Sequence, residues 1–312
     1  MTRSLNASRA RKLRERLASK VLVVAPGVYD GLSARIAGAA GFEALYASGG
    51  AIARSAGLPD LGLLSLTEML IQTREIVDAT DLPVIADGDA GHGNALNVFR
   101  TVREFERLGV AALHLEDQMS PKKCGHYAGK HLVSEDEMLG KLRAAQDARK
   151  DPDLVLIART DARAVEGLEA AIRRANRYAE AGADLIFVEA PESEEELRTV
   201  ARQVRAPLLV NMFQGGRTPL VGPAALAEMG YRVMIVPSDL QRAAIRALQE
   251  AAAAIKATGT AAGLGARLAG FDERDALVDL EAWQGREDRY AAADDGNGGA
   301  RRGSRGGQRD AR

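Results

Sequence analysis

Four acidic residues stand at the ends of three short apolar runs, where a parallel β-sheet would bring them to one edge. Asp87 and Asp89 follow one run, Glu116 ends another, and Glu189 follows a third. Clustered like charges are unstable unless a cation joins them or some are protonated. Oxygen-only ligation suits Mg²⁺ or Mn²⁺. One aspartate in such a place is more often a helix N-cap, but four acids at three run ends favour a divalent metal site.

A fixed cation and a glycine turn supply groups that complement an anionic ligand. Arg159 follows a further apolar run, and its planar guanidinium fork suits a carboxylate. The alternative is a structural ion pair with one of the nearby acids. Ser48, Gly49 and Gly50 follow an earlier run and expose backbone N–H groups that can bind an anionic oxygen. Gly-Gly pairs are common in turns, so this turn indicates an anion-binding site only in combination with the acids and Arg159.

The single cysteine, Cys124, lies in a long polar stretch between two lysines, a glycine and a histidine. A free cysteine is usually a small buried hydrophobic residue. The cationic neighbourhood predicts instead a thiol that titrates near neutrality, which could donate a proton and be regenerated from solvent. Gly125 and Gly129 would let this loop move as a lid.

Apolar, β-branched runs alternate with amphipathic helical stretches, which implies parallel strands joined by crossover helices. Eight such units within about 240 residues favour a (β/α)8 barrel, whose chemistry lies at the carboxyl ends of the strands. The expected strands are Val21–Ala25, Ala44–Ala47, Pro83–Ala86, Ala112–Leu115, Val155–Ala158, Leu185–Val188, Pro207–Val210 and Val233–Val236. The clearest helices are Asn97–Leu108, Glu135–Ala148, Leu168–Ala181 and Glu194–Val204.

An open, doubly wound sheet is the alternative to a barrel. Such a sheet usually carries a glycine-rich phosphate turn after its first strand, and Pro26–Asp30 is not one. Repeated glycines just past the helices, as at Gly109 and Gly182, are typical left-handed caps before a following strand. The alternation therefore favours the barrel.

The two ends of the chain differ in character. Leu5, Leu13 and Leu17 have helical spacing and predict a helix that covers the barrel floor, in preference to a transit peptide suggested by the basic residues there. Residues 1–290 are expected to form a single barrel domain. Residues 291–312 are rich in glycine and arginine, contain no large apolar residue, and are expected to be disordered. An Arg/Gly tail can bind RNA, but a solvated tail explains this composition sufficiently.

Composition excludes several classes of protein. The formal net charge of −1 argues against binding to nucleic acid or an anionic membrane. One cysteine rules out an intrachain disulfide and fits a reducing cytoplasm. No apolar run approaches the roughly 20 residues that span a bilayer. A cytoplasmic enzyme with a small-molecule substrate is the expectation.

Taken together, these segments resemble the isocitrate lyase and phosphoenolpyruvate mutase superfamily, most closely its 2-methylisocitrate lyase and 2,3-dimethylmalate lyase branch. The resemblance covers roughly residues 10–290, and its most specific segment is Lys122–His126. The matching segments are Tyr46–Gly50, Gly57–Gly62, Asp87–Asp89, His114–Gln118, Lys122–His126, Ala158–Asp161, Val188–Ala190 and Asn211.

The resemblance implies roles for the matching residues. Asp87 would ligate Mg²⁺ directly, while Asp89 and Glu116 would hold its waters. Cys124 would be the general acid of a mobile loop. The implied substrate contacts are Ser48, Gly49, Gly50, Cys124, Gly125, His126, Arg159, Glu189, Asn211 and Arg242. Tyr46 and Asp60 lie in active-site segments of the family, and Tyr46 is grouped with Cys124 and Arg159 as a catalytic residue.

The resemblance further implies an extra C-terminal helix that swaps onto a neighbour, usually within a homotetramer. The expected reaction is magnesium-dependent carbon–carbon cleavage of a 2-methylisocitrate-like 2-hydroxy acid to pyruvate and a carboxylate such as succinate. The alternatives are a 2,3-dimethylmalate or 2-alkylmalate lyase, or an oxaloacetate decarboxylase. A mutase-type enzyme is disfavoured because those relatives lack the Cys-Gly-His acid. A non-catalytic barrel would be expected to lose Asp87 or Cys124.

Three departures from the family pattern bear on the substrate. His92 stands where relatives usually have an aromatic residue, and Gly88 replaces a commoner alanine. Gln214 replaces a glutamate often found shortly after Asn211. The last change removes a charge near the end of the pocket that sorts substrates, so the choice among 2-hydroxy acids stays open at this point.

Overall fold

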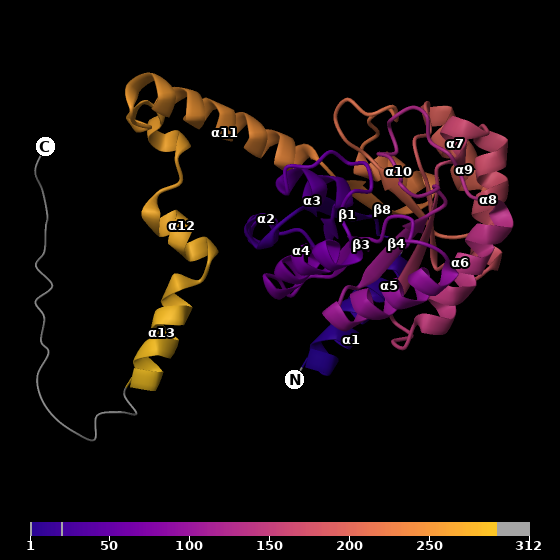
Figure 1. Ribbon diagram of the computed structural model, residues 1–312, viewed down its shortest axis with the longest axis horizontal. Helices are drawn as coiled ribbons and strands as arrows, with labels where there is room; N and C mark the ends of the chain where they lie inside the picture. The colour runs from indigo at the N-terminus through magenta and orange to yellow at the C-terminus, as the bar shows by residue number, and fades with distance from the viewer. Residues whose placement is uncertain (1, 20, 292–312) are drawn as a thin grey trace, which may run out of the picture. The chain divides into compact units, whose positions relative to one another are not determined.

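The computed structural model describes residues 2–19 and 21–291. Eight parallel strands pair in chain order and close into a barrel, with β1 pairing both β2 and β8 (Figure 1). The strands are β1 (Val23–Val28), β2 (Leu45–Ala47), β3 (Val84–Asp87), β4 (Ala112–Glu116), β5 (Val155–Thr160), β6 (Leu185–Val188), β7 (Leu208–Asn211) and β8 (Tyr231–Val236). The predicted (β/α)8 barrel is confirmed.

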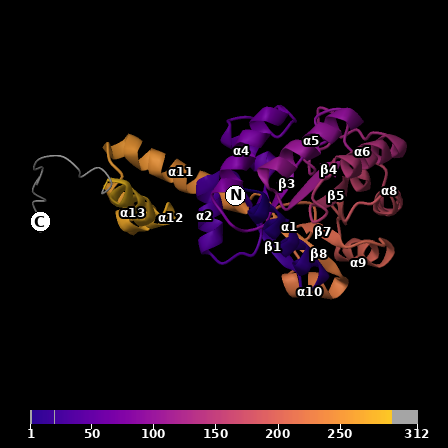
Figure 2. The same cartoon turned by 90° about the horizontal axis from the view of Figure 1, so that it is seen from below.

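Helices α2 to α10 follow the strands and surround the barrel, as Figure 2 shows from a second direction. The helix bounds are α1 (Thr2–Ala18), α2 (Gly31–Ala39), α3 (Gly49–Ser55), α4 (Leu66–Asp78), α5 (Ala95–Leu108), α6 (Glu135–Ala148), α7 (Ala162–Val165), α8 (Leu168–Glu180), α9 (Glu194–Gln203), α10 (Pro223–Met229), α11 (Asp239–Thr258), the 3₁₀ helix η1 (Ala262–Arg267), α12 (Phe271–Leu277) and α13 (Leu280–Ala291). The four helices expected from periodicity are present, with ends that differ by at most two residues.

Local capping explains where these helices begin and end. The Asn94 side chain accepts hydrogen bonds from the backbone N–H groups of Leu96 and Asn97, which satisfies donors that have no partner within α5. Gly109 ends α5 with φ 89°, a left-handed conformation that is costly for residues with a Cβ. Ser134 caps α6 in the same way through the N–H of Glu137. Short-range chemistry therefore sets the helix limits independently of the barrel.

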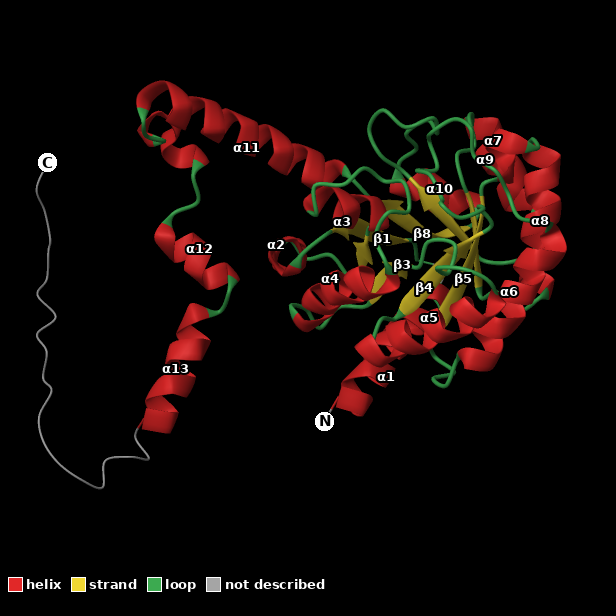
Figure 3. Ribbon diagram, in the orientation of Figure 1, coloured by secondary structure: helices red, strands yellow, loops and turns green. Residues whose placement is uncertain are grey.

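The strand register brings the predicted functional side chains to one end of the barrel. Asp87 of β3 is in register with His114 of β4, and Glu116 of β4 is in register with Arg159 of β5. Because all strands are parallel, their carboxyl ends share one rim. The loops at this rim lie at the opposite side of the barrel from α1 (Figure 3).

Buried apolar side chains form two clusters, as the strand alternation requires. The inner cluster fills the barrel with residues such as Ile85, Ile157 and Phe187. Leu13 of α1 is 1% exposed and belongs to this inner cluster, so the predicted helix at the barrel floor is confirmed. The outer cluster packs the other strand face against the surrounding helices.

Strands β1 and β8 begin at residues other than those predicted, because pairing with the neighbouring strand sets where each strand starts. Val21 was expected to begin β1 but is 53% exposed, and the strand begins at Val23, where pairing with Val233 of β8 starts. β8 begins at Tyr231, two residues before its expected start. The side chain of Leu5 and the predicted tail from residue 292 onward lie outside the described residues.

The chain divides into two compact units, Met1–Leu264 and Gly265–Arg312. In the second unit the structure describes residues 265–291, which include α12 and α13, and neither helix buries a side chain. The single-domain limit at residue 290 stays a prediction. Among the described residues, no helix is long and apolar enough to cross a membrane.

Candidate active site

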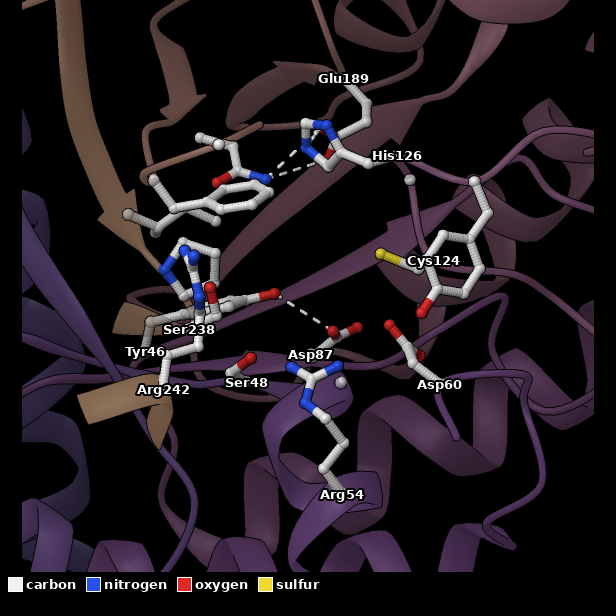
Figure 4. A pocket seen from close by; sticks show the side chains of 18 of the residues that line it. Tyr46, Ser48, Arg54, Asp60, Asp87, Cys124, His126, Glu189, Ser238 and Arg242 are labelled. Atoms are coloured by element: carbon white, nitrogen blue, oxygen red, sulfur yellow. Dashed lines mark hydrogen bonds and ion pairs between the residues drawn. The ribbon is translucent and has the colours of Figure 1, made fainter. Parts of the chain in front are cut away.

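A cavity of about 440 Å³ opens at the carboxyl ends of the strands (Figure 4). It brings together residues that are far apart in the chain, from Tyr46 to Ile245. The predicted site residues that line it are Tyr46, Ser48, Gly50, Asp60, Asp87, Cys124, Gly125, His126, Arg159, Glu189, Asn211 and Arg242. Gly49, Asp89 and Glu116 do not line the cavity, but each contacts a residue that does.

Asp87 is the most heavily hydrogen-bonded acid of the site. Its carboxylate accepts hydrogen bonds from the Tyr46 hydroxyl at 3.1 Å and from the backbone N–H groups of Gly49 and Asp89 at 3.2 and 3.0 Å. His114 Nε2 lies 3.1 Å from Oδ1. Burial acts to raise the pKa of Asp87, but His114, Lys122 and Arg159 outweigh it and hold that pKa well below its ordinary value. Asp87 therefore keeps a negative charge at the base of the cavity.

The other two acids of the predicted metal site behave differently. Burial raises the pKa of Glu116 well above its ordinary value, and burial together with Asp87 raises the pKa of Asp89. Glu116 Oε1 is buried and has no hydrogen-bond partner within the described chain. A nearby cation would favour the charged form of both acids and give this oxygen an electrostatic partner, directly or through water.

This donor set fits magnesium. The three acids offer only carboxylate oxygens, which Mg²⁺ prefers. Among the described residues, no group of three or more His, Cys, Asp or Glu side chains is placed to hold a metal ion by itself. Mg²⁺ commonly keeps several waters and takes only one or two protein carboxylates. The geometry is therefore compatible with direct ligation by Asp87 and water-mediated contact to Asp89 and Glu116.

Arg159 is both a cavity residue and the centre of an ion-pair network. Its guanidinium lies 2.9 Å from Asp161, 3.3 Å from Glu116 and 3.3 Å from Glu189. It also lies over the Phe187 ring, with its Cζ atom 5.1 Å from the ring centroid. The predicted alternatives, a substrate contact and a structural ion pair, are compatible, because the same side chain lines the cavity and pairs with these acids.

Two buried lysines anchor the Cys124 loop to the barrel. Lys122 Nζ lies 2.5 Å from Asp60 and 2.9 Å from Asp89. Lys130 Nζ lies 2.7 Å from Asp161 and donates a second hydrogen bond to the carbonyl of Gly125. Its side chain is 1% exposed. These contacts place the loop over the cavity from both sides of Cys124.

Gly125 is required for this close approach. A Cβ at that position would collide with the Arg159 guanidinium and the Glu189 side chain. Beyond it, His126 Nε2 lies 3.1 Å from Glu189, and its ring meets the Phe213 ring edge-on at 4.6 Å between centroids. The Cys-Gly-His segment is therefore seated directly on the predicted substrate contacts.

Cys124 differs from the expectation of a thiol that titrates near neutrality. Burial and the negative charge of Asp60 raise the pKa of Cys124 to about 11. Lys122, one of the lysines that suggested a lower value, is paired with two carboxylates. Lys123 Nζ donates to the carbonyl of Gly129. Burial and Asp60 thus outweigh the nearby cations, and the thiol stays protonated at neutral pH, as a proton donor must.

We expect the thiolate of Cys124 to form only in strongly alkaline solution. Because the chain has one cysteine, the absorbance difference at 240 nm between the protein and its Cys124→Ser variant reports this thiol alone. An increase centred near pH 11 is expected, since burial disfavours the anion. Half-ionisation at pH 9 or below would contradict the environment described here.

Sequence reasoning gave no role to His114, which contacts two residues of the cavity, and missed several residues that line it. His114 stands two residues before Glu116 on β4, so strand alternation predicts that both point inward, and its Nε2 lies 2.8 Å from the Tyr46 hydroxyl. His114 does not itself line the cavity, whereas Arg54, Phe187, Phe213 and Ser238 do. Strand alternation could also have indicated Phe187, but the other three are placed by the packing of helices and loops.

The three departures from the family pattern have different structural consequences. Gln214 lines the cavity and can contact a ligand, whereas His92 is not among the lining residues. A Cβ at position 88 would lie 2.7 Å from the carbonyl oxygen of His114, so the local backbone suits glycine.

Comparison with known proteins agrees with this geometry. A family model described as phosphoenolpyruvate phosphomutase matches residues 13–256. The chain is 46% identical over 283 residues to the 2,3-dimethylmalate lyase of Eubacterium barkeri, an alignment that covers 90% of this chain and 98% of that protein. It is 49% identical over 248 residues to the 2-methylisocitrate lyase of Aeropyrum pernix, with 80% of each chain covered.

Solved structures show the same similarity in three dimensions. A crystal structure of 2,3-dimethylmalate lyase, described as a PEP mutase/isocitrate lyase superfamily member, matches with a TM-score of 0.85 and 38% identity, covering 95% of this chain and 99% of that one. A phosphonopyruvate hydrolase in complex with oxalate and Mg²⁺ matches with a TM-score of 0.83 and 32% identity, covering 91% and 99%.

Fold and site together define a barrel enzyme whose acids, arginine and thiol face one cavity at the strand carboxyl ends. The chain belongs to the phosphoenolpyruvate phosphomutase family, within the PEP mutase/isocitrate lyase superfamily. The predicted resemblance and the predicted class of enzyme, a carbon–carbon lyase, are confirmed by these named relatives.

Proposed function

We propose that this protein is a magnesium-dependent lyase that cleaves a 2-hydroxy di- or tricarboxylate to pyruvate and a second carboxylate. The observation that carries the proposal is the placement of a protonated thiol, Cys124, in the same cavity as the ionised Asp87 and the guanidinium of Arg159. A lyase of this kind needs an acid that faces the carbon left by the departing fragment. A phosphoryl transfer needs no such acid.

Asp87, Asp89 and Glu116 are the residues that would hold Mg²⁺ or Mn²⁺ in the proposed enzyme. The chemical contribution of the ion would be to lower the pKa of the substrate's 2-hydroxyl. Ser48 and Gly50 line the adjacent wall, and Gly49 donates its N–H to Asp87, so this turn keeps the acid in place beside the keto-acid end. A solved relative that contains oxalate and Mg²⁺ supports this assignment.

The chain's own residues account for the remaining steps. Tyr46 donates a hydrogen bond to Asp87 and contacts His114, which orients it beneath the substrate. Arg159, with Glu189 and Asn211, would position the carboxylates, while Arg242 contributes a cation at the cavity mouth. Electrostatic stabilisation by fixed charges of this kind is usually the largest catalytic contribution.

Cleavage then proceeds with a balanced transfer of one electron pair and two protons. The 2-hydroxyl gives up its proton to solvent, the C2–C3 bond breaks, and C2 becomes the carbonyl carbon of pyruvate. The bonding electrons move to C3, which is stabilised as an aci-carboxylate. The Cys124 thiol donates its proton to C3, and the second carboxylate product, such as succinate, leaves. Solvent reprotonates the thiolate.

Release of pyruvate from purified protein tests this proposal. We expect strong release, abolished by a chelator and restored by Mg²⁺, from one of 2-methylisocitrate, 2,3-dimethylmalate, a simple 2-alkylmalate or oxaloacetate. The chelator matters because the proposed acids alone cannot replace the charge of the ion. Absence of pyruvate from all four substrates at saturating Mg²⁺ would count against the lyase and in favour of a mutase-type reaction.

A 2,3-dimethylmalate or 2-alkylmalate lyase is the second candidate, with oxaloacetate decarboxylation as a related activity. Gln214 favours it, because a neutral side chain lines the cavity where relatives often carry a glutamate. The extent of the match to 2,3-dimethylmalate lyase, 98% of that protein, gives further support. The substrate panel distinguishes the two candidates directly.

A homotetramer with swapped C-terminal helices, located in the cytoplasm, completes the proposal. The support is the exposure of large apolar side chains in residues 265–291: Phe271 is 74% exposed and Trp283 is 61% exposed. Side chains of this size are normally buried, so contact with another copy of the chain would account for them.

A further inference from the structure

One cation of the cavity has no role in the reaction as proposed so far. The lysine and arginine residues that line the cavity are Arg54, Lys122, Arg159 and Arg242. Lys122, Arg159 and Arg242 each form ion pairs with carboxylates of the chain itself. Arg54 alone of the four has no ion pair within residues 2–19 and 21–291. Its charge is therefore available to a ligand.

Arg54 is nevertheless held in a defined orientation. Its Nε donates a hydrogen bond of 2.9 Å to Oε1 of Gln241, a residue of α11 that is 4% exposed. The other end of the same amide donates a hydrogen bond of 2.8 Å to the carbonyl of Ala51. Both ends of a buried glutamine are thus used, one to fix α3 and one to fix Arg54. A cation oriented before binding loses less entropy when a ligand arrives.

The guanidinium reaches the cavity beside Gly50. Helical side chains lean toward the N-terminus of their helix, so Arg54 extends back over the turn that contains Gly50. Its Nη2 lies 3.5 Å from the position that a Cβ of Gly50 would occupy. Figure 4 shows the guanidinium near Ser48, Asp60 and Asp87, pointing toward the open space that they border.

The neighbouring acid does not account for Arg54. Asp60 also faces Gly50, with Oδ2 2.6 Å from the same Cβ position. Its other oxygen, however, already lies 2.5 Å from Lys122 Nζ. Arg159, the other strong cation of the site, is shared among three carboxylates. A carboxylate ligand beside Gly50 would therefore find Arg54 as its uncommitted cationic partner.

We propose that Arg54, held by Gln241, is a specificity-determining residue that binds the carboxylate of the 2-oxo acid at the Gly50 side of the cavity. The location of the keto-acid end beside Gly50 rests on the proposed function. A guanidinium presents paired N–H groups that match the two oxygens of a carboxylate. Neutral analogues of the 2-oxo acid gain nothing from this charge, so Arg54 selects for the ionised carboxyl group.

Calorimetric titration of the Mg²⁺-loaded full chain with pyruvate and with its neutral amide, pyruvamide, tests the inference without turnover. Arg54→Gln is expected to raise the Kd of pyruvate about tenfold, because a charge-assisted hydrogen-bonded pair is lost. The Kd of pyruvamide is expected to stay unchanged, because this ligand carries no charge. Gln241→Met keeps the charge but removes its tether, and a smaller rise is expected. Arg246→Gln is the matched control, because Arg246 lies on α11 and does not line this cavity.

The outcomes separate the inference from the proposed function. An unchanged pyruvate Kd in Arg54→Gln, or an equal change in Arg246→Gln, would overturn the role of Arg54. Pyruvate binding that depends on Arg54, in a protein that cleaves none of the four substrates, would uphold the inference while rejecting the lyase. If Arg54→Gln does not fold, Arg54→Met removes the same charge while keeping a long side chain, and its pyruvate Kd decides between the same alternatives.

Discussion

Replacing Cys124 with serine is expected to lower the turnover of the cleaved 2-hydroxy acid by about 10³-fold, the range typical of a lost general acid. The substitution keeps the size and position of the side chain, but a hydroxyl is a much weaker acid than a thiol. Cys124 lines the cavity, and its raised pKa keeps the proton in place at neutral pH. Steady-state pyruvate release at saturating Mg²⁺ measures the effect.

Binding should survive this substitution. Pyruvate affinity in Cys124→Ser is expected to stay within about twofold of the unsubstituted protein, because the carboxylate partners are provided by other residues. A fall in turnover with unchanged product affinity would identify a defect in proton transfer. Unchanged turnover would remove the acid role of Cys124, and a parallel loss of pyruvate affinity would point to a displaced loop.

Replacing Lys130 with methionine should affect both activity and stability. Its buried ammonium joins the Gly125 carbonyl to Asp161, and Asp161 in turn pairs with Arg159. The substitution leaves the Gly125 carbonyl without this donor and leaves part of the Asp161 charge uncompensated. Loss of one partner in a buried pair of this kind lowers the free energy of unfolding by about 2–4 kcal/mol. The loop that carries Cys124 loses its anchor, so kcat/KM is expected to fall by about 100-fold.

The matched control for Lys130 lies on the same loop. Lys123 donates its ammonium hydrogen bond to Gly129, next to Lys130, and forms no ion pair within the described residues. Lys123→Met should change the free energy of unfolding by less than about 0.5 kcal/mol, as surface substitutions commonly do. Urea unfolding and steady-state kinetics compare the two variants. Equal effects of both would show that Lys130 has no special anchoring role.

The barrel was predictable because its elements are encoded locally. Alternating apolar runs and amphipathic stretches predict the eight strands and their helices, and caps such as Asn94 and Gly109 act over three or four residues. Strand ends were less predictable. β1 begins at Val23 because β8 pairs with it there, and that partner is more than 200 residues away in the chain.

The acids and Arg159 were also predictable as a group, since parallel strands place all their carboxyl ends at one rim. His114 could have been added from strand alternation alone. Cys124 lines the cavity, but the expectation of a thiol pKa near neutrality was wrong. The sequence places two lysines beside the thiol, whereas the fold directs one of them to Asp60 and Asp89 and leaves the thiol half-buried.

The sequence by itself determined the type and order of the strands and helices, the rim at which chemistry is possible, and the family. Only the tertiary structure decided which charges remain available. Pairing between Lys130 and Asp161, and between Gln241 and Arg54, depends on helices and loops that are distant in sequence and meet by packing. Burial and partner choice set the charge of each group, and neither is a property of a residue and its neighbours along the chain.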